Sequence, residues 1–225
     1  MEKRHTLQAF EQALSDLSAA VLIMTEHVQA MVASAAHVLL DNDLVRAGEV
    51  VENDLVVDRE LETIRARCLD ILVRYQPVAG DLRQVIAIEH SAGNLERAAD
   101  HAKNIAKRAI ADRNSRISAD AAELFRQLHA AVLGALEDAN DALVRRDVDL
   151  AHKVVRGDRR IDVLHDDLFH LVLAGSRRDT SKLKSDIHLL FAAKSLERIG
   201  DHATNIAEEV IFMSRREAPD GSIDT

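Results

Sequence analysis

Apolar residues recur at steps of three and four along almost the whole chain, and the two-residue alternation typical of half-buried β-strands is missing. Because an α-helix completes a turn every 3.6 residues, this spacing gives each segment one continuous apolar face. Polar interruptions divide the pattern into six helical segments. We expect helices at about residues 6–40, 43–76, 80–111, 118–145, 148–173 and 181–214.

Local signals mark several ends of these helices. Asp43 is expected to cap the second helix, because a short carboxylate accepts a hydrogen bond from a free backbone N–H. Pro77 ends that helix, since proline disfavours helical backbone at the preceding residue. Residues 112–116 form the predicted link between halves, with Ser118 as the cap of the fourth helix. The short polar segment 215–225 is expected to be a flexible tail.

A fifteen-residue phrase occurs twice, at residues 94–108 and 195–209. Nine of the fifteen positions are identical, and they include Glu, Arg, Asp, His and Asn as well as core residues. Packing alone would preserve the apolar positions and let the polar ones drift, so the repeat indicates a duplicated fold and a duplicated site. We predict an all-α fold of two tandem antiparallel three-helix bundles, at residues 1–113 and 114–214.

Composition narrows the classes of protein to which the chain belongs. The single cysteine, Cys68, excludes an intramolecular disulfide, fits a reducing cytoplasm, and lies in apolar surroundings that predict a buried, inert thiol. A formal net charge of -9 argues against nucleic acid as the main partner. The eight glycines form no phosphate-binding loop. No uninterrupted apolar run approaches the roughly 20 residues of a membrane span.

Each half carries two acidic pairs whose members are four residues apart and therefore share one helix face. On the third and sixth helices these pairs lie roughly 110–150° from the centre of the apolar stripe, which places them outside the bundle. On the middle helix of the first half the pair lies about 80–120° away, on the flank. The candidate positions are Asp58, Glu62, Glu96 and Asp100 in the first half, and Asp158, Asp162, Glu197 and Asp201 in the second.

Two adjacent helices would gather the four carboxylates of each half along one external edge. Their repulsion would be offset by a multivalent cation, and oxygen ligands accept Mg, Mn, Fe and, with less preference, Zn. Alternatively, the pairs are solvated faces balanced by neighbours such as Lys103 and Lys107. Recurrence in both halves favours a metal site. His101 and His202 also recur, and we interpret them as interhelical hydrogen-bonding groups rather than ligands.

With these residues identified, the chain resembles the PhoU family of phosphate-signalling regulators over about residues 1–214. The motifs that carry the resemblance are Leu196–Ala207, Asp158–Asp162 and Asp81–Arg83. The first half departs from the family pattern at Ala98 and Ala99, where Ile-Gly is usual, and at Glu62, where Asp is more usual. The carboxylate change keeps the capacity to bind a metal.

The resemblance implies a cytoplasmic negative regulator of phosphate-starvation signalling and phosphate uptake, without catalytic residues. It also implies an adaptor between the ATPase subunit of a phosphate ABC transporter and a sensor histidine kinase, which reaches the membrane only through these partners. Family members can hold multinuclear iron or zinc clusters on the outer faces, through the acidic pairs. We expect a homodimer and no nucleic-acid partner.

Two other functions compete with the adaptor. A carboxylate-bridged metal enzyme, such as a di-iron oxidase, would direct Glu and Glu-x-x-His ligands into the bundle interior. Here Ala99 and Gly200 stand three residues after Glu96 and Glu197, where such a histidine would be needed. The remaining alternative is a metal-free helical scaffold whose acidic edge is simply solvated.

Overall fold

The structure is a computed structural model that describes residues 2–113, 117–176 and 179–214, with side chains from residue 7 onward. Six long helices make up these ranges, which contain no strand, and this confirms the all-α prediction. The helices are α1 (Glu2–Leu40), α2 (Leu44–Tyr75), α3 (Ala79–Ala111), α4 (Ala119–Arg145), α5 (Val148–Ser176) and α6 (Leu183–Ser214), with a short 3-10 turn, η1 (Thr180–Lys182), before α6. The predicted tail at 215–225 and most of the link at 112–116 lie outside the described residues.

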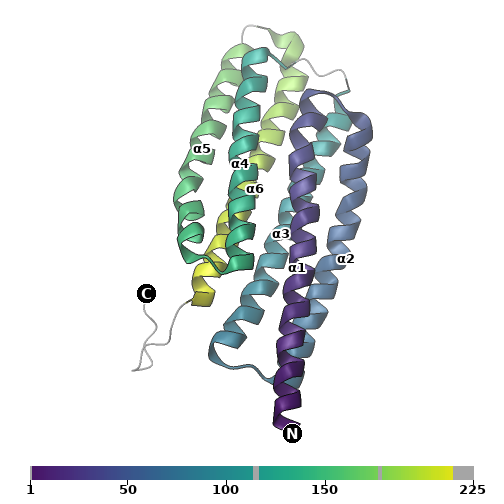
Figure 1. Cartoon of the computed structure of the whole chain (residues 1–225). Coiled ribbons are helices and arrows are strands. Elements are labelled where there is room, and N and C mark those ends of the chain that lie inside the picture. The colour runs from purple at the N-terminus through teal and green to yellow at the C-terminus, as the bar shows by residue number, and fades with distance from the viewer. Residues whose placement is uncertain (1, 114–116, 177–178, 215–225) are drawn as a thin grey trace.

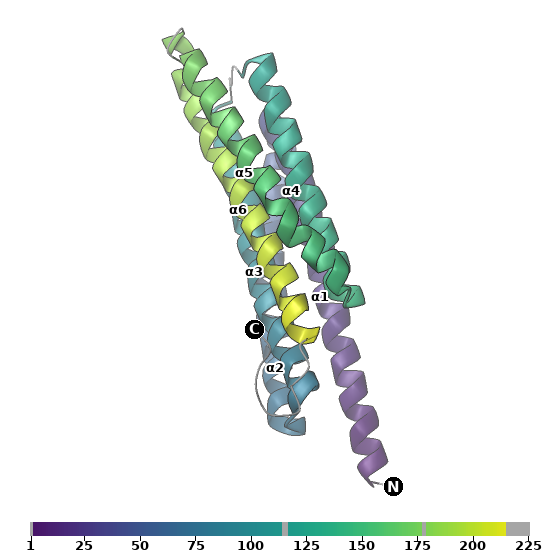
Figure 2. The same ribbon diagram turned by 90° about the vertical axis from the view of Figure 1, so that its left-hand side faces the viewer.

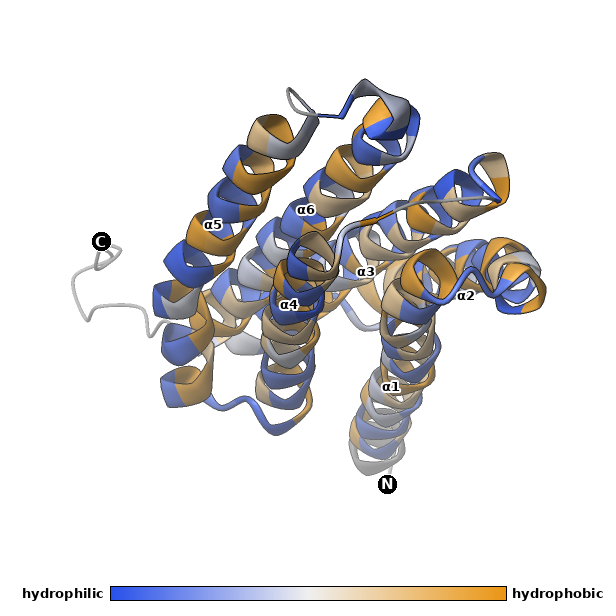
Figure 3. Cartoon of the chain, turned by 90° about the horizontal axis from the view of Figure 1, so that it is seen from above, coloured by the Kyte–Doolittle hydropathy of each residue, from blue (hydrophilic) through white to orange (hydrophobic). Residues whose placement is uncertain are grey.

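The six helices form two elongated three-helix bundles that lie side by side (Figures 1 and 2). Helices α1, α2 and α3 pack together in one bundle, and α4, α5 and α6 pack together in the other. Seen along the helices, α3 and α6 occupy the middle of the molecule, while α2 and α5 lie at its outer sides (Figure 3). The third helix of each half therefore builds both its own bundle and the contact between bundles.

Capping hydrogen bonds and a proline set where several of the helices begin and end. The Asp43 carboxylate accepts a hydrogen bond from the backbone N–H of Arg46 at 3.0 Å, and the Ser118 hydroxyl accepts one from Ala121 at 3.3 Å. Both predicted caps are confirmed. At the end of α2, Gln76 adopts left-handed backbone with φ 47°, and Pro77 then prevents the helix from continuing.

Among the helices that the structure describes, only α1 is long and apolar enough, over Leu7–Leu40, to meet the length and composition expected of a membrane-crossing helix. Its apolar side chains nevertheless pack in the core of the protein. Leu17, Met24 and Val28 are fully buried against the other helices. An amphipathic core helix satisfies the same criterion, so the finding adds no argument for a membrane span.

Polar contacts fix how the two bundles meet. His90 donates from Nδ1 to Glu209 at 3.0 Å at one end of the α3–α6 contact, while the Arg108 guanidinium lies 4.1 Å from the centre of the Phe191 ring further along. These pairings show that α3 and α6 run antiparallel. A second contact joins α1 to α4, where the buried His129 ring donates from Nε2 to the Val32 carbonyl oxygen at 2.8 Å.

The only cysteine lies inside the first bundle. Cys68 is 4% exposed, and its sulfur lies 3.8 Å from the carbonyl oxygen of Val85 on α3. Burial, with a smaller contribution from the charge on Glu89, raises the pKa of the Cys68 thiol to about 12. The thiol is therefore protonated at neutral pH, in agreement with the predicted inert role.

Gly200 permits an unusually close approach between α6 and α5. A Cβ atom at this position would lie 2.9 Å from Cδ1 and 3.3 Å from Cγ2 of Ile161. At the equivalent positions of the first half the residues are Ala99 and Val57, both buried. The larger residue on α3 is thus paired with a valine, which lacks the Cδ1 atom of isoleucine, so each half has its own matched pair.

We predict that Gly200→Ala lowers the free energy of unfolding by about 1 kcal/mol. Overpacking costs about 1–3 kcal/mol and outweighs the roughly 1 kcal/mol that alanine gains over glycine in a helix. The matched variant, Gly200→Ala with Ile161→Val, should be more stable than the single variant, because it removes the Cδ1 atom that the new methyl group would meet and recreates the pair found in the first half. Urea unfolding followed by circular dichroism measures both. A single variant more stable than wild type would contradict the close-packing argument.

Candidate functional site

The acidic pairs lie on the outside of the bundles, as the helical wheel predicted. On α3, Glu96 and Asp100 are half-buried, and on α6 the same holds for Glu197 and Asp201. On the middle helices Asp158 is half-buried and the other three carboxylates are exposed, namely Asp58, Glu62 and Asp162. None of the eight lies in the apolar interior.

The four carboxylates of the second half act on one another. The Asp158 carboxylate accepts a hydrogen bond from the Thr204 hydroxyl on α6 at 3.1 Å, which ties α5 to α6 at this point. Burial raises the pKa of Asp158, the Thr204 hydrogen bond opposes that shift, and the charges of three neighbours add to it. Those neighbours are Asp162, Asp201 and Glu197. We name Asp158, Asp162, Glu197 and Asp201 the second acidic cluster.

In the first half the group of interacting carboxylates differs from the predicted set at one position. Burial raises the pKa of Glu96, and the negative charges of Asp100, Asp58 and Asp54 raise it further. Asp54 was not among the predicted positions, and it is 5% exposed. Glu62, which was predicted, is exposed on α2. We name Asp54, Asp58, Glu96 and Asp100 the first acidic cluster.

A lysine from α3 lies within the first acidic cluster. The Lys103 ammonium donates to Asp54 at 2.6 Å and also to Asp100. Only 19% of the Lys103 side chain and 7% of the Asp54 side chain are exposed, so this is an enclosed ion pair. Burial disfavours the charged ammonium, but the hydrogen bonds to Asp100 and Asp54 outweigh that effect and raise the pKa of Lys103. The enclosure separates it from an ordinary surface ion pair.

A sequence signal for the enclosed pair did exist. Asp54 stands in the buried row of α2 that runs through Val50, Val57 and Leu61, where an apolar residue is expected. A carboxylate in such a row needs a cationic partner, since an unpaired buried charge is strongly destabilising. Asp54 and Asp58 also stand four residues apart, so the sequence offers this pair as well as the predicted pair of Asp58 with Glu62.

The second acidic cluster is balanced differently. Lys194 contacts Glu197 and Arg198 contacts Asp201 at 3.1 Å, each within one helical turn. Both cationic side chains are about half exposed. Exposed ion pairs of this kind contribute little to stability, about 0–1 kcal/mol, and exchange readily with solvent.

The donor atoms of the acidic clusters suit a hard cation, although no ligand set is assembled. Among the residues that the structure describes, no three His, Cys, Asp or Glu side chains are arranged to hold a metal ion. The second acidic cluster offers carboxylate oxygens from two helices, half open to solvent, which is the donor chemistry of a divalent-cation site. Binding there requires Lys194 and Arg198 to turn outward, and their exposure permits this.

The recurring histidines meet at the centre of the molecule. The rings of His101 and His202 stack across the α3–α6 contact, with centroids 5.7 Å apart. His202 also donates from Nδ1 to the Asn94 side-chain oxygen at 3.0 Å, and Asn205 donates to the same oxygen at 3.2 Å. His202 is therefore an interhelical hydrogen-bonding group, as predicted, and His101 contributes by stacking.

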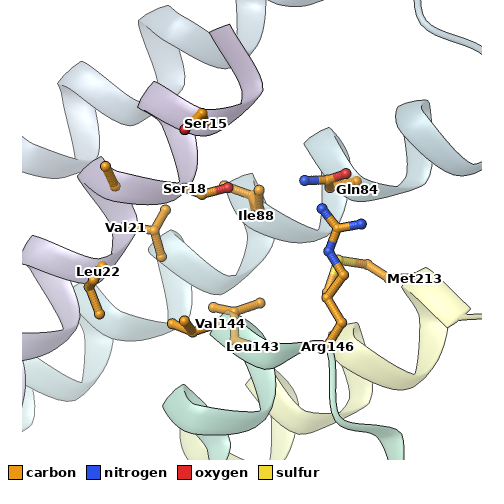
Figure 4. A pocket seen from close by; sticks show the side chains of 11 residues that line it. Ser15, Ser18, Val21, Leu22, Gln84, Ile88, Leu143, Val144, Arg146 and Met213 are labelled. Atoms are coloured by element: carbon orange, nitrogen blue, oxygen red, sulfur yellow. The ribbon is translucent and has the colours of Figure 1, made fainter. Parts of the chain in front are cut away.

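A cleft of about 300 Å³ lies between the bundles, away from the acidic clusters. Figure 4 shows that α1, α3, α4 and α6 all contribute to its walls. Val21, Leu22 and Leu143 provide apolar surface, while Arg146 extends toward Gln84. Arg146 has left-handed backbone, with φ 55°, immediately after α4. None of the eight predicted acidic residues lines this cleft.

Comparison with known proteins gives the family. The sequence model of the PhoU domain matches residues 21–109 and again residues 125–210, one copy in each bundle. The chain belongs to the PhoU family. Both copies contain the repeated phrase and its acidic pair, which confirms the resemblance drawn from the motifs.

Individual relatives match over nearly the full length. The chain is 33% identical to a "Phosphate-specific transport system accessory protein PhoU homolog" of Rhizobium meliloti, over 98% of this chain and 93% of that protein. It is 37% identical to the PhoU homolog of the same name from Zymomonas mobilis, over 92% of this chain and 87% of that one.

Solved PhoU structures share the fold. The crystal structure of PhoU from Pseudomonas aeruginosa superimposes with a TM-score of 0.87 at 34% identity, covering 91% of this chain and 98% of that one. The Streptococcus pneumoniae phosphate transport system regulatory protein PhoU, at 24% identity, supports the fold alone, with a TM-score of 0.83 over 91% of this chain and 96% of that one. The six-helix arrangement is therefore that of the family.

We predict that Lys103→Met lowers the free energy of unfolding by about 2–4 kcal/mol, because it leaves Asp54 buried without its cation. The matched control is Lys107→Met, an exposed lysine one turn further along α3, which should change stability by less than about 0.5 kcal/mol. Urea unfolding in chelator-treated buffer measures both variants. Equal stability of the two would show that the Asp54–Lys103 pair is not a buried ion pair.

A second prediction concerns the stability of the protein at acidic pH. Burial, together with the nearby charges of His101 and Arg97, lowers the pKa of His202 to about 4. The unfolded chain has an ordinary histidine pKa of about 6.5 and so binds the proton more tightly than the folded protein. The contribution of neutral His202 is therefore complete above pH 6.5 and declines as the pH falls toward 4. His202→Gln should flatten the fall in urea midpoint between pH 7 and 5 in chelator-treated buffer. An unchanged slope would contradict the assignment.

Proposed function

We propose that this chain is a cytoplasmic, non-enzymatic regulator of phosphate uptake that represses phosphate-starvation signalling when phosphate is sufficient. In this role it acts as an adaptor between the ATPase subunit of a phosphate ABC transporter and a sensor histidine kinase. The observation that carries the proposal is the nearly full-length match to phosphate-specific transport system accessory proteins, with both repeats of the family present.

The architecture is suited to an adaptor. Two long bundles joined along α3 and α6 give a stiff body with separate outer surfaces on α2 and α5. Such a body can contact two partners without a change of its own fold. A homodimer would double the number of docking surfaces, and this also forms part of the proposal.

The acidic clusters are proposed to bind divalent metal. The candidate ligands predicted from the sequence are Asp58, Glu62, Glu96 and Asp100 in the first half, where Asp54 rather than Glu62 is among the charges acting on Glu96. In the second half they are Asp158, Asp162, Glu197 and Asp201. Iron and zinc are the metals implied by the family resemblance, and the oxygen donors also accept magnesium and manganese. A bound cation would offset the repulsion that contributes to the raised pKa values of Glu96 and Asp158. It would also order the outer edge on which a partner docks.

The enzyme alternative receives no support from the position of the carboxylates. Di-iron carboxylate sites in helical bundles are built from ligands that project into the bundle interior. Here the interior between the helices is filled by apolar side chains such as Leu95, Leu196 and Ile199, and the acidic groups lie on its outside. The adaptor remains the function that the geometry favours.

Deletion of the gene in its host tests the regulatory role. We expect phosphate-starvation genes to stay active in phosphate-rich medium, because the kinase is no longer inhibited. A transcriptional reporter measures their activity. The wild-type gene on a plasmid should restore repression. Normal repression in the deletion strain would contradict the proposal.

The same deletion strain tests whether regulation depends on metal binding. It is complemented with a variant in which Glu96, Asp100, Glu197 and Asp201 are all alanine, and the metal content of the recovered protein is measured. If metal is lost and repression is lost with it, the metal is required for signalling. If metal is lost but repression is kept, the adaptor role is supported, and metal is not required for signalling.

A further inference from the structure

The cleft between the two bundles lies away from the acidic clusters, and the proposed function does not use it. Its apolar surface includes Val21 of α1, Ile88 of α3 and Leu143 of α4, all of which are buried. Leu22 and Val144 continue this surface toward solvent, with 41% and 51% of each residue exposed. Small-molecule pockets have volumes of roughly 300–1,000 Å³ and are mostly apolar. At about 300 Å³, the cleft therefore suits a small, largely apolar ligand.

A buried carboxamide borders this cleft. Gln84 on α3 is 6% exposed, and its side chain lies at the cleft opposite the guanidinium of Arg146 (Figure 4). Within the described ranges of the chain, the Gln84 side chain has no hydrogen-bond partner. Buried polar groups of native proteins are nearly always hydrogen-bonded. This carboxamide therefore needs a partner that occupies the cleft.

The second polar group of the cleft is a guanidinium without a counterion. Among the described residues that line the cleft, Arg146 alone carries a charge. It forms no ion pair with any part of the chain that the structure describes, whereas its neighbour Arg145 contacts Asp141 at 3.1 Å. The Arg146 and Gln84 side chains extend toward each other but share no hydrogen bond. Two sets of N–H donors thus meet at one end of an apolar cleft.

We propose that the cleft binds a small aliphatic monocarboxylate. Its hydrocarbon chain lies against Val21, Ile88 and Leu143, and its carboxylate accepts hydrogen bonds from the Arg146 guanidinium and the Gln84 carboxamide. The planar fork of a guanidinium matches the two oxygens of a carboxylate, and charge-assisted hydrogen bonds of this kind are the stronger ones. This site is independent of the proposed regulatory role and of the acidic clusters.

The charge of the ligand follows from the charge of the cleft. One guanidinium balances one negative charge, whereas a dianionic phosphate monoester would leave a second charge uncompensated beside apolar walls. An uncharged alcohol of the same length would leave Arg146 without its counterion. The protein as a whole carries a formal charge of -9, so it repels small anions elsewhere on its surface.

Binding at this place would connect the two bundles. The residues that line the cleft come from α1 and α3 of the first bundle and from α4 and α6 of the second, with Arg146 directly after α4. A ligand between them contacts both halves at once and favours the arrangement in which they lie together. Because it binds only the folded protein, it also raises the midpoint of unfolding.

Isothermal titration calorimetry of the full chain at pH 7 tests the proposal, with sodium octanoate as the probe and 1-octanol as the uncharged control. We expect one octanoate to bind per chain and octanol to bind at least tenfold more weakly. Octanoate should also raise the urea midpoint of the wild-type protein.

Four variants locate the ligand, and circular dichroism checks that each remains helical. Arg146→Gln should weaken octanoate binding about tenfold or more, because the counterion is lost. Gln84→Leu, which keeps the volume of the side chain, should weaken it severalfold. The matched control is Arg145→Gln, which removes an arginine outside the cleft and should leave binding unchanged. Ala19→Leu narrows the cleft from α1 and should weaken octanoate and octanol alike.

The proposal is overturned if octanoate neither releases or absorbs heat nor shifts the urea midpoint, since the cleft then holds solvent only. It is also overturned if octanol binds as tightly as octanoate, because the polar end then has no role in recognition. Equal octanoate binding by Arg146→Gln and Arg145→Gln would place the ligand elsewhere. Unchanged binding by Ala19→Leu would lead to the same conclusion by a route that leaves the polar end intact.

Discussion

Contact between α3 and α6 is the constraint on which the arrangement of the whole molecule depends. The rings of His101 and His202 stack across this contact, and the Arg108 guanidinium covers the Phe191 ring. Polar groups then specify direction and register, because the Asn94 side-chain oxygen accepts hydrogen bonds from both His202 and Asn205. A shift by one turn would leave these groups unpaired in a partly buried interface, which is costly. The outer helices α2 and α5 are positioned by their packing on this central pair.

Duplication has preserved the geometry of the halves while part of their chemistry has diverged. Ala99 with Val57 and Gly200 with Ile161 are two solutions to the same packing problem. At the outer edge Lys103 donates to Asp54 in the first half, and Thr204 donates to Asp158 at the equivalent place in the second. A methyl group added at Gly200 alone would create a clash, and loss of the ammonium at 103 would leave Asp54 without its cation.

Most of the fold was accessible from the sequence because the helices are long and strongly periodic. The expected end of the fifth helix at residue 173 and the start of the sixth at 181 differ from the structure by two or three residues, since a 3-10 turn precedes Leu183. The outward placement of the acidic pairs also followed from angular position alone. That calculation describes one helix at a time. It therefore could not show that His101 and His202 stack on each other, or that Lys103 reaches across to Asp54, because both depend on distances between helices.

The buried, protonated thiol of Cys68 gives the first bundle a built-in reporter of its motions. A maleimide or similar electrophile reacts with a thiolate in contact with solvent, and neither condition is met while α2 and α3 are closed around this side chain. Alkylation of the native protein must therefore wait for a transient opening of that bundle, and its rate measures how often such openings occur. The sequence of the second bundle contains no cysteine, so this bundle does not react in the same experiment. Fluctuations of one half can thus be followed separately from those of its twin, without adding any label site.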